Sequence, residues 1–267
     1  MLVKNKTSVK AVILSAGQGR RLLPLTENSP KCLLPISGKT ILEWQVDALL
    51  AVGIEEITVV TGFQTGLVEK LLQQRYPDHT QINTIFNPFF EVADNLASCW
   101  MARSVMNCDF LLLNGDTVFD IPLLKKILNS TPAPITLSVD SKDTYDADDM
   151  KVQLDEKGWV KHVNKTLSKD QIDAESIGLI YFRLHGPKKF RVAVEKALRN
   201  PSELKSWYLT IIDNLANIHL VNTCSISGHH WCEIDYSADL SKAKVLFSEL
   251  NNIEDTQVTR NILQTDI

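Results

Sequence analysis

Glycines and positively charged residues gather between positions 14 and 35 of the 267-residue chain. The segment follows a short apolar run and holds Gly17 and Gly19, then Arg20 and Arg21, then Lys31 directly after a proline. Glycines let backbone N–H groups come close to a ligand, and such groups favour anions. Arginine and lysine add full positive charge beside them. The segment therefore predicts a binding loop for a nucleoside triphosphate.

Two common phosphate-binding motifs do not fit this segment. A dinucleotide fingerprint needs a third glycine where the chain has Leu22, and a P-loop ending at Thr40 needs a glycine where it has Leu33. A tight turn with solvated arginines would explain Gly17 and Gly19 alone. It would not explain arginine, proline and lysine at fixed positions over the whole segment, so we interpret it as a phosphate-binding loop.

Asp116 is a candidate metal ligand, and Asp235 is a second aspartate at the end of a strand-like run. Asp116 follows the apolar run 110–113 and an Asn-Gly pair, which is where α/β sheets bind ligands. Asp235 ends the run 231–235, and its side chain points the same way as that of Glu233 if the run is a strand. A carboxylate at the position of Asp116 can hold Mg²⁺ beside phosphates. Each aspartate could instead cap a following helix, so the residues alone leave both interpretations open.

Apolar and amphipathic segments alternate in the first half of the chain and must position these residues. Strand-like runs at 10–14, 57–61, 82–86 and 110–113 alternate with segments of helical spacing at 41–52, 66–75 and 95–106. This β-α-β alternation predicts an α/β fold with a mostly parallel, Rossmann-like mixed sheet flanked by helices. A β-helix domain would need a hexapeptide repeat, and the chain has none.

The second half changes character, with a hairpin expected over 150–163 and shorter strands and helices after it. We expect a single domain over residues 1–251. Its nucleotide-binding half covers 9–120 and its acceptor-binding half 121–251, and a polar tail follows at 252–267.

Composition limits the partners and the compartment. The net charge of −4 lacks the basic excess of nucleic-acid binders. No apolar stretch approaches the ~20 residues of a membrane helix, and the first residues are too polar for a secretion signal. Five cysteines without a CxxC pair indicate free thiols in a reducing compartment. We expect a cytoplasmic protein that binds neither nucleic acid nor a membrane.

The loop segment resembles the N-terminal signature of the nucleotidyltransferases that join nucleoside monophosphates to sugar 1-phosphates and similar phosphate acceptors. The matching residues are Gly17, Gly19, Arg21, Leu22, Pro24, Leu25, Thr26, Pro30 and Lys31. The resemblance implies a GT-A-like nucleotidyltransferase fold, with Mg²⁺ as cofactor and Asp116 and Asp235 as its ligands.

The same resemblance implies the roles of the loop. Arg21 and Lys31 would be the catalytic residues, because in the family an arginine and a lysine neutralise phosphate charge. The residues expected to bind the nucleotide here are Leu14, Ala16, Gly17, Gly19 and Arg20.

Later segments resemble one subgroup, the small cytidylyltransferases that act on phosphocholine, aminoethylphosphonate or inositol phosphate. Asn95 and Ser98 match their Asn-x-x-Ser stretch, which implies nucleotide binding with CTP preferred. The stretches 163–165 and 175–178 are also similar, and Lys165 would reach the acceptor phosphate. Glu175 and Trp231 are expected to line the acceptor pocket. A solvated lysine and a core tryptophan are the alternatives for Lys165 and Trp231.

We therefore expect an enzyme that transfers CMP from CTP to a small phosphate- or phosphonate-bearing acceptor and releases pyrophosphate. A sugar-1-phosphate nucleotidylyltransferase that uses UTP, dTTP or GTP is the near alternative. A non-catalytic nucleotide-binding regulatory protein is an alternative of another class, although it should lack some of the charged residues kept here. The residues leave the acceptor and the oligomeric state open.

Overall fold

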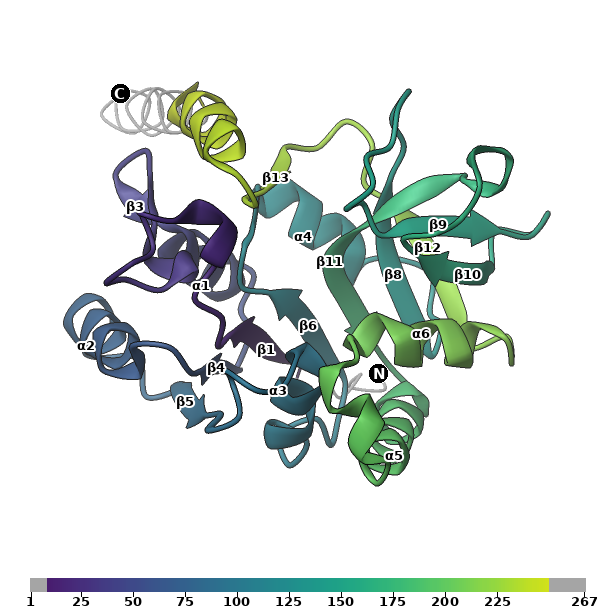
Figure 1. The fold of residues 1–267 in the computed structure, drawn as a ribbon, viewed down its shortest axis with the longest axis horizontal. Coiled ribbons are helices and arrows are strands. Elements are labelled where there is room, and N and C mark those ends of the chain that lie inside the picture. Colours follow the sequence, from purple (N-terminus) through teal and green to yellow (C-terminus); the bar gives the residue numbers. More distant parts are fainter. Residues whose placement is uncertain (1–8, 250–267) are drawn as a thin grey trace, which may run out of the picture.

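The computed structural model describes residues 9–249, in which one large sheet lies between two layers of helices (Figure 1). The sheet has nine strands, seven of them in the order β10-β9-β11-β6-β1-β4-β5, and β8 pairs with β11 and β12. Its strands are β1 (Lys10–Ser15), β4 (Glu56–Thr61), β5 (Ile82–Phe86), β6 (Phe110–Asn114), β8 (Ile135–Asp140), β9 (Lys151–Leu154), β10 (Val160–Asn164), β11 (Ala174–Phe182) and β12 (Val221–Ser225).

The sheet reverses its order at β1. From β1 the chain continues to β4 and β5 on one side and then returns to β6 on the other side, and all these pairs are parallel. Such a reversal opens a crevice at the carboxyl ends of the strands, where open α/β sheets bind ligands. Beyond β6, β11 pairs antiparallel with β6, β8 and β9, so the second half of the sheet is mixed.

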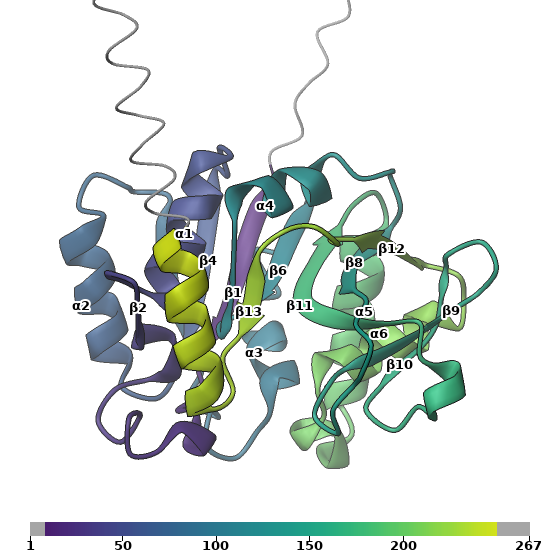
Figure 2. The ribbon, with the colours of Figure 1, turned by 90° about the horizontal axis from the view of Figure 1, so that it is seen from above.

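Helices cover both faces of the sheet because consecutive residues of a strand point to opposite sides. Ala11 and Ile13 of β1 pack in a core with α1, α2 and α4, whereas Val12 packs in a core with α3, α5 and α6. Figure 2 shows the two helix layers on either side of the strands. The helices are α1 (Ile41–Ala51), α2 (Thr65–Arg75), α3 (Asn95–Met101), α4 (Ile121–Leu128), α5 (Gly186–Leu198) and α6 (Tyr208–Ala216), and a further helix covers residues 237–249.

Two small two-stranded sheets complete the elements near the crevice. β2 (Pro35–Ile36) pairs with β3 (Lys39–Thr40), and β7 (Thr117–Phe119) pairs with β13 (Trp231–Glu233). The second pair joins the middle of the chain to its C-terminal part, because β7 directly follows β6 while β13 precedes the last helix. It is this pair that brings the C-terminal carboxylates to the large sheet.

The fold class predicted from the sequence is confirmed, including the helices on both faces. Some details were wrong or missed: the third helix ends at Met101 rather than near residue 106, and β8 and the short strands β2, β3 and β7 were not predicted. The predicted tail, 252–267, lies outside the described residues, and the domain bounds stay a prediction. Within residues 9–249, no helix combines the length and the apolar character needed to cross a membrane. The cytoplasmic location stays a prediction.

Candidate active site

The glycine loop after β1 packs the candidate catalytic lysine against its own backbone. Gly19 has a left-handed φ of 79°, and a Cβ at this position would lie 2.8 Å from Cβ of Lys31. Thr26 ties the loop together, since its hydroxyl donates to the carbonyl of Gly19 at 2.8 Å. Leu22 is buried beneath the loop in a core shared with Ile41. A glycine is therefore required at position 19 by both its conformation and its contact with Lys31.

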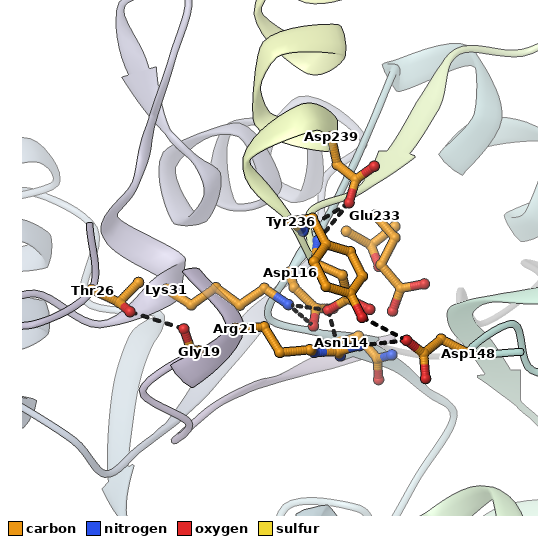
Figure 3. Close-up of polar contacts among 12 residues, drawn as sticks. Gly19, Arg21, Thr26, Lys31, Asn114, Asp116, Asp148, Glu233, Tyr236 and Asp239 are labelled. Carbon is orange, nitrogen blue, oxygen red and sulfur yellow. Dashed lines mark hydrogen bonds and ion pairs between the residues drawn. The ribbon is translucent and has the colours of Figure 1, made fainter. Parts of the chain in front are cut away.

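Lys31 joins the two aspartates expected to be metal ligands, and Figure 3 shows its ammonium beside Asp116. Its Nζ lies 2.7 Å from Oδ2 of Asp116 and 2.7 Å from Oδ1 of Asp235. Burial alone would lower the pKa of Lys31, but the charges of the two aspartates outweigh it and raise the pKa. The ammonium therefore stays charged inside the site.

The pairing of β7 with β13 places Asp116 and Asp235 side by side. Glu233 is the register partner of Thr117, and the N–H of Ile234 donates to the carbonyl of Asp116 at 3.0 Å. From the other side, the amide nitrogen of Gln45 in α1 donates to the carbonyls of Asn114 and Thr117. The turn that carries Asp116 is thus held by a buried helix and by a strand from the far end of the described chain.

Arg21 extends the charge network toward the second half of the fold. One guanidinium nitrogen lies 2.8 Å from Oδ1 of Asp235 and another lies 3.1 Å from Oδ2 of Asp148. The hydroxyl of Tyr236 donates to the same Asp148 oxygen at 2.8 Å, and the guanidinium stacks over the Tyr236 ring. Figure 3 shows Arg21 and Tyr236 converging on Asp148. The two positive side chains expected to be catalytic therefore share Asp235.

A cavity of about 300 Å³ lies on one side of this network, at the carboxyl ends of β1, β5 and β6. Most residues expected to bind the nucleotide line it: Leu14, Ala16, Gly17, Asn95 and Ser98. Asp116 also lines it, so the cavity reaches the carboxylates. Gly19 and Arg20 do not line it. The Arg20 side chain is exposed and has no hydrogen bond or ion pair among the described residues, so nucleotide binding by these two stays a prediction.

A second cavity, of about 500 Å³, lies on the other side of the carboxylates. Glu175 and Trp231, two of the residues expected to bind the acceptor, line it together with Glu233 and Asp235. The indole N–H of Trp231 donates to Asp140 at 2.8 Å, which fixes the ring. Lys165, the third residue expected to bind the acceptor, does not line this cavity.

Lys165 lies instead at the border of a neighbouring cavity, with its ammonium over the ring of Trp207. Its Nζ is 3.8 Å from Oδ1 of Asp148, the residue that Arg21 also binds. A phosphate that reached Arg21 would therefore lie near Lys165 as well. Acceptor binding by Lys165, Glu175 and Trp231 stays a prediction.

Two carboxylates of the larger cavity are held in environments that disfavour their charge. Burial, with the negative charges of Asp116 and Asp235 beside it, raises the pKa of Glu233 to about 8. Burial raises the pKa of Glu175 to about 6, although the ammonium of Lys142 at 2.7 Å opposes this shift. The site thus concentrates more negative charge than its own lysines and arginine neutralise, which favours a bound cation.

Residues 10–146 match the nucleotidyl transferase family, over more than half of the chain. The chain belongs to this family. The CTP:phosphoglutamine cytidylyltransferase of Campylobacter jejuni is 26% identical to it over 259 residues, which cover 87% of this chain and 98% of the relative. The CMP-5'-(3-aminopropyl)phosphonate synthase of Streptomyces rubellomurinus is 28% identical over 258 residues, which cover 90% of this chain but 39% of that longer protein.

A solved structure supports the fold of this nucleotidyltransferase. The CTP:phosphocholine cytidylyltransferase from Streptococcus pneumoniae superposes with a TM-score of 0.72 at 20% identity, covering 90% of this chain and 99% of that one. The resemblance to the nucleotidyltransferase family inferred from the loop is thereby confirmed, and so is an enzyme of the nucleotidyltransferase class.

Nucleotidyltransferases generally use a divalent metal, and three carboxylates of this chain fit one. Asp116, Glu233 and Asp235 each offer an oxygen, and these atoms lie within 4.8 Å of one another. The Oδ1 atom of Asp116 is buried without a hydrogen-bond partner among the described residues. Oxygen donors of this kind suit Mg²⁺. The donor set therefore fits a magnesium ion, with Glu233 added to the two aspartates expected from the sequence.

Sequence reasoning missed a further polar residue of the nucleotide cavity, Asn87. It lies at the carboxyl end of β5, is 1% exposed, and donates to the hydroxyl of Ser98 at 3.0 Å. Its own side-chain oxygen accepts from the N–H of Phe89. The signal was a polar residue directly after a parallel strand, the same signal that identified Asp116.

Proposed function

We propose that this nucleotidyltransferase is a Mg²⁺-dependent cytidylyltransferase that transfers CMP from CTP to a small phosphate- or phosphonate-bearing acceptor and releases pyrophosphate. The observation that carries the proposal is the position of the Lys31 and carboxylate cluster. It lies between two cavities, one lined by Asp116 and the glycine loop, the other by Glu233 and Asp235. This arrangement suits the joining of two phosphate-bearing molecules.

The reaction needs charge neutralisation more than proton transfer. A phosphate monoester has a second pKa near 6, so it is largely a dianion at pH 7 and already a nucleophile. The obstacle is repulsion between this dianion and the triphosphate. Lys31 and Arg21 place two positive charges where the cavities meet, and their shared partner Asp235 holds both in fixed positions. No general base is required, in keeping with the absence of a catalytic triad from the sequence.

The carboxylates complete this electrostatic account. When bound, Mg²⁺ would supply further neutralisation of phosphate charge, with Asp116, Glu233 and Asp235 as its ligands. Lys31 already bridges two of these carboxylates, so it keeps them close together and oriented before a nucleotide arrives.

The preference for CTP is supported by the printed activities of the relatives and by the lining of the smaller cavity. Cytosine presents an amino donor where uracil and thymine present an acceptor oxygen. Asn95, Ser98 and the backbone around Leu14–Gly17 line the cavity that would hold the base. A site built for a donor leaves groups unpaired when an acceptor replaces it, so uridine and thymidine nucleotides would bind less well.

The test is product formation across a panel of acceptors. CTP and Mg²⁺ would be incubated with phosphocholine, aminoalkylphosphonates, polyol phosphates and sugar 1-phosphates, and the product would be identified by mass spectrometry as a CMP adduct together with pyrophosphate. Products formed from UTP, dTTP or GTP with a sugar 1-phosphate would establish the sugar nucleotidyltransferase instead. Nucleotide binding without any product would establish the regulatory alternative.

A further inference from the structure

Lys151, at the start of β9, is a buried lysine with an unusual set of partners. The residue is 6% exposed, and its ammonium forms no ion pair within the described part of the chain. The ammonium donates to three main-chain carbonyls: Asp146 at 2.6 Å, Lys165 at 3.0 Å and Asp149 at 3.4 Å. An ammonium has three N–H donors, so these carbonyls use all of them.

The three carbonyls belong to two segments that meet at the candidate active site. Asp146 and Asp149 lie in the loop between β8 and β9, residues 141–150, which we name the acceptor loop. Lys165 directly follows β10. Between the two anchored carbonyls of the loop lies Asp148, whose carboxylate contacts Arg21, Tyr236 and Lys165. The buried ammonium therefore joins the main chains of the two segments whose side chains meet at Asp148.

Other contacts hold the acceptor loop at its two ends, where the hydroxyl of Ser141 donates to the carbonyl of Asp173 and the N–H of Ser176 donates to the carbonyl of Met150. It separates the 500 Å³ cavity from a cavity of about 610 Å³ behind it, and Lys142, Asp146 and Ala147 line both. One further tie comes from Lys142, whose ammonium bridges Asp149 and Glu175. The side chain of Asp148 is about half exposed, so burial does not fix it. The bonds to Lys151 thus hold the main chain on both sides of Asp148, while its carboxylate contacts Arg21 and Tyr236.

We propose that Lys151 is a positioning residue for the acceptor subsite: its ammonium holds the acceptor loop against Lys165, so that Asp148 keeps Arg21 and Lys165 together where the acceptor phosphate arrives. The proposal rests on the proposed function, because it assigns the acceptor to the 500 Å³ cavity. The three carbonyls occupy all the donors of the Lys151 ammonium, so it does not bind a phosphate in either cavity. Its effect is therefore on acceptor binding and not on nucleotide binding.

The experiment compares Lys151→Met, which keeps the length of the side chain and removes its charge, with Lys151→Arg. Lys161→Met is the matched control, because Lys161 is an exposed lysine on the neighbouring strand β10 with no polar partner in the described structure. KM for the acceptor, KM for CTP and kcat are measured for each. Cleavage of the acceptor loop by a protease that cuts before aspartate is followed by mass spectrometry, without substrates.

For Lys151→Met we expect KM for the acceptor to rise at least about tenfold, with KM for CTP changed less than about twofold. Cleavage before Asp146, Asp148 or Asp149 should become at least about fivefold faster than in the wild type and in Lys161→Met. If Lys151→Met does not fold, Lys151→Arg should still raise KM for the acceptor by about threefold or more, because a planar guanidinium cannot reproduce the three bonds.

Equal changes in the two KM values, or a fall in kcat alone, would overturn the proposal in favour of a general structural role. Failure of the proposed function has a different signature, namely a wild-type protein that forms no product with any acceptor. In that case the cleavage measurement still decides, since an unchanged cleavage rate in Lys151→Met would show that this lysine does not anchor the loop.

Discussion

Single residues in this site are arranged as alternating opposite charges. Lys31 lies between Asp116 and Asp235, and Arg21 lies between Asp235 and Asp148. Each positive side chain is thus held by two carboxylates before any phosphate is present. Phosphate oxygens and a divalent cation can take over these contacts without a net loss of ion pairs, which keeps the cost of reorganisation low.

Replacement of Lys31 tests this arrangement. Lys31→Met removes a charge that would face the transferred phosphoryl group, so we expect kcat to fall at least about a hundredfold. Arg21→Ala should have an effect of similar size. Lys70→Met, at an exposed lysine of α2, is the control and should leave kcat unchanged. Rates come from pyrophosphate release, with circular dichroism to verify folding; a folded Lys31→Met enzyme with near-normal kcat would contradict the assignment.

The aspartates are tested by metal titration. Asp116→Asn and Asp235→Asn each remove a charged oxygen ligand, so the Mg²⁺ concentration at half-maximal activity should rise at least about tenfold. Asp78→Asn, at an exposed aspartate after α2, should leave it unchanged. Full activity of the wild type in the presence of EDTA, or an Asp235→Asn variant with an unaltered titration, would reject the metal site.

The raised pKa of Glu175 predicts how the stability of the protein changes with pH. Its pKa is raised from the ordinary value of 4.5 to about 6, so the folded state holds the proton more tightly than the unfolded chain. The stability that this group contributes is complete below pH 4.5 and is lost as the pH rises through 6.

Relative to Glu175→Gln, the wild type should therefore lose about 2 kcal/mol of unfolding free energy between pH 4 and pH 7. Urea denaturation of both proteins across this range measures the difference. The control Glu91→Gln changes an exposed glutamate and should show no such trend. A constant difference between the wild type and Glu175→Gln would contradict the prediction.

The ends of two neighbouring strands approach each other closely at Gly115, the glycine that precedes Asp116. A Cβ on Gly115 would lie 2.5 Å from the carbonyl oxygen of Leu14 and 2.9 Å from Cα of Ser15. The approach is between backbones, since the N–H of Gly115 donates to that same carbonyl. The ends of β1 and β6 can therefore adjoin here only with glycine at position 115.

Gly115→Ala should accordingly destabilise the protein by about 1–3 kcal/mol and lower kcat, because the turn that carries Asp116 must shift. Gly66→Ala is the contrasting control: it lies in α2 with nothing within 4 Å of a Cβ, so it should stabilise by up to about 1 kcal/mol. Thermal unfolding and turnover of both variants provide the comparison. Equal behaviour of the two alanine variants would refute this account of the contact.

Most helices and strands could be predicted from the sequence because the patterns that indicate them are local. The β-branched run 57–61 and the helical spacing of 41–52 match β4 and α1 closely. β8 was missed although its alternation of apolar residues with Thr136 and Ser138 is typical of a strand, and both polar residues are buried in the structure. The third helix was predicted too long because Ala102 and Met106 continue an apolar spacing, and both are buried although they lie beyond the end of the helix.

The whole molecule brings the two halves of the chain together at the carboxylates, and this juxtaposition is not local. Asp116 was singled out from the end of a strand-like run and Asp235 from the family resemblance, but the pairing of β7 with β13 that makes them neighbours has no sequence signal. The contact of Arg21 with Asp148 likewise has no signal in the sequence. Such contacts depend on how the last strand returns to the large sheet, which only the folded structure shows.

Cytidylyl transfer at this junction is the central claim, and nucleotide selection tests it most directly. With one accepted acceptor and saturating Mg²⁺, kcat/KM is measured for CTP, UTP, dTTP, ATP and GTP by pyrophosphate release. We predict that CTP exceeds UTP and dTTP by at least about a hundredfold, or about 3 kcal/mol, because an acceptor oxygen replaces the amino donor and leaves buried partners unpaired. ATP and GTP should also be poorer substrates, because a purine base is larger than a pyrimidine base. A higher kcat/KM for UTP or dTTP would contradict the claim.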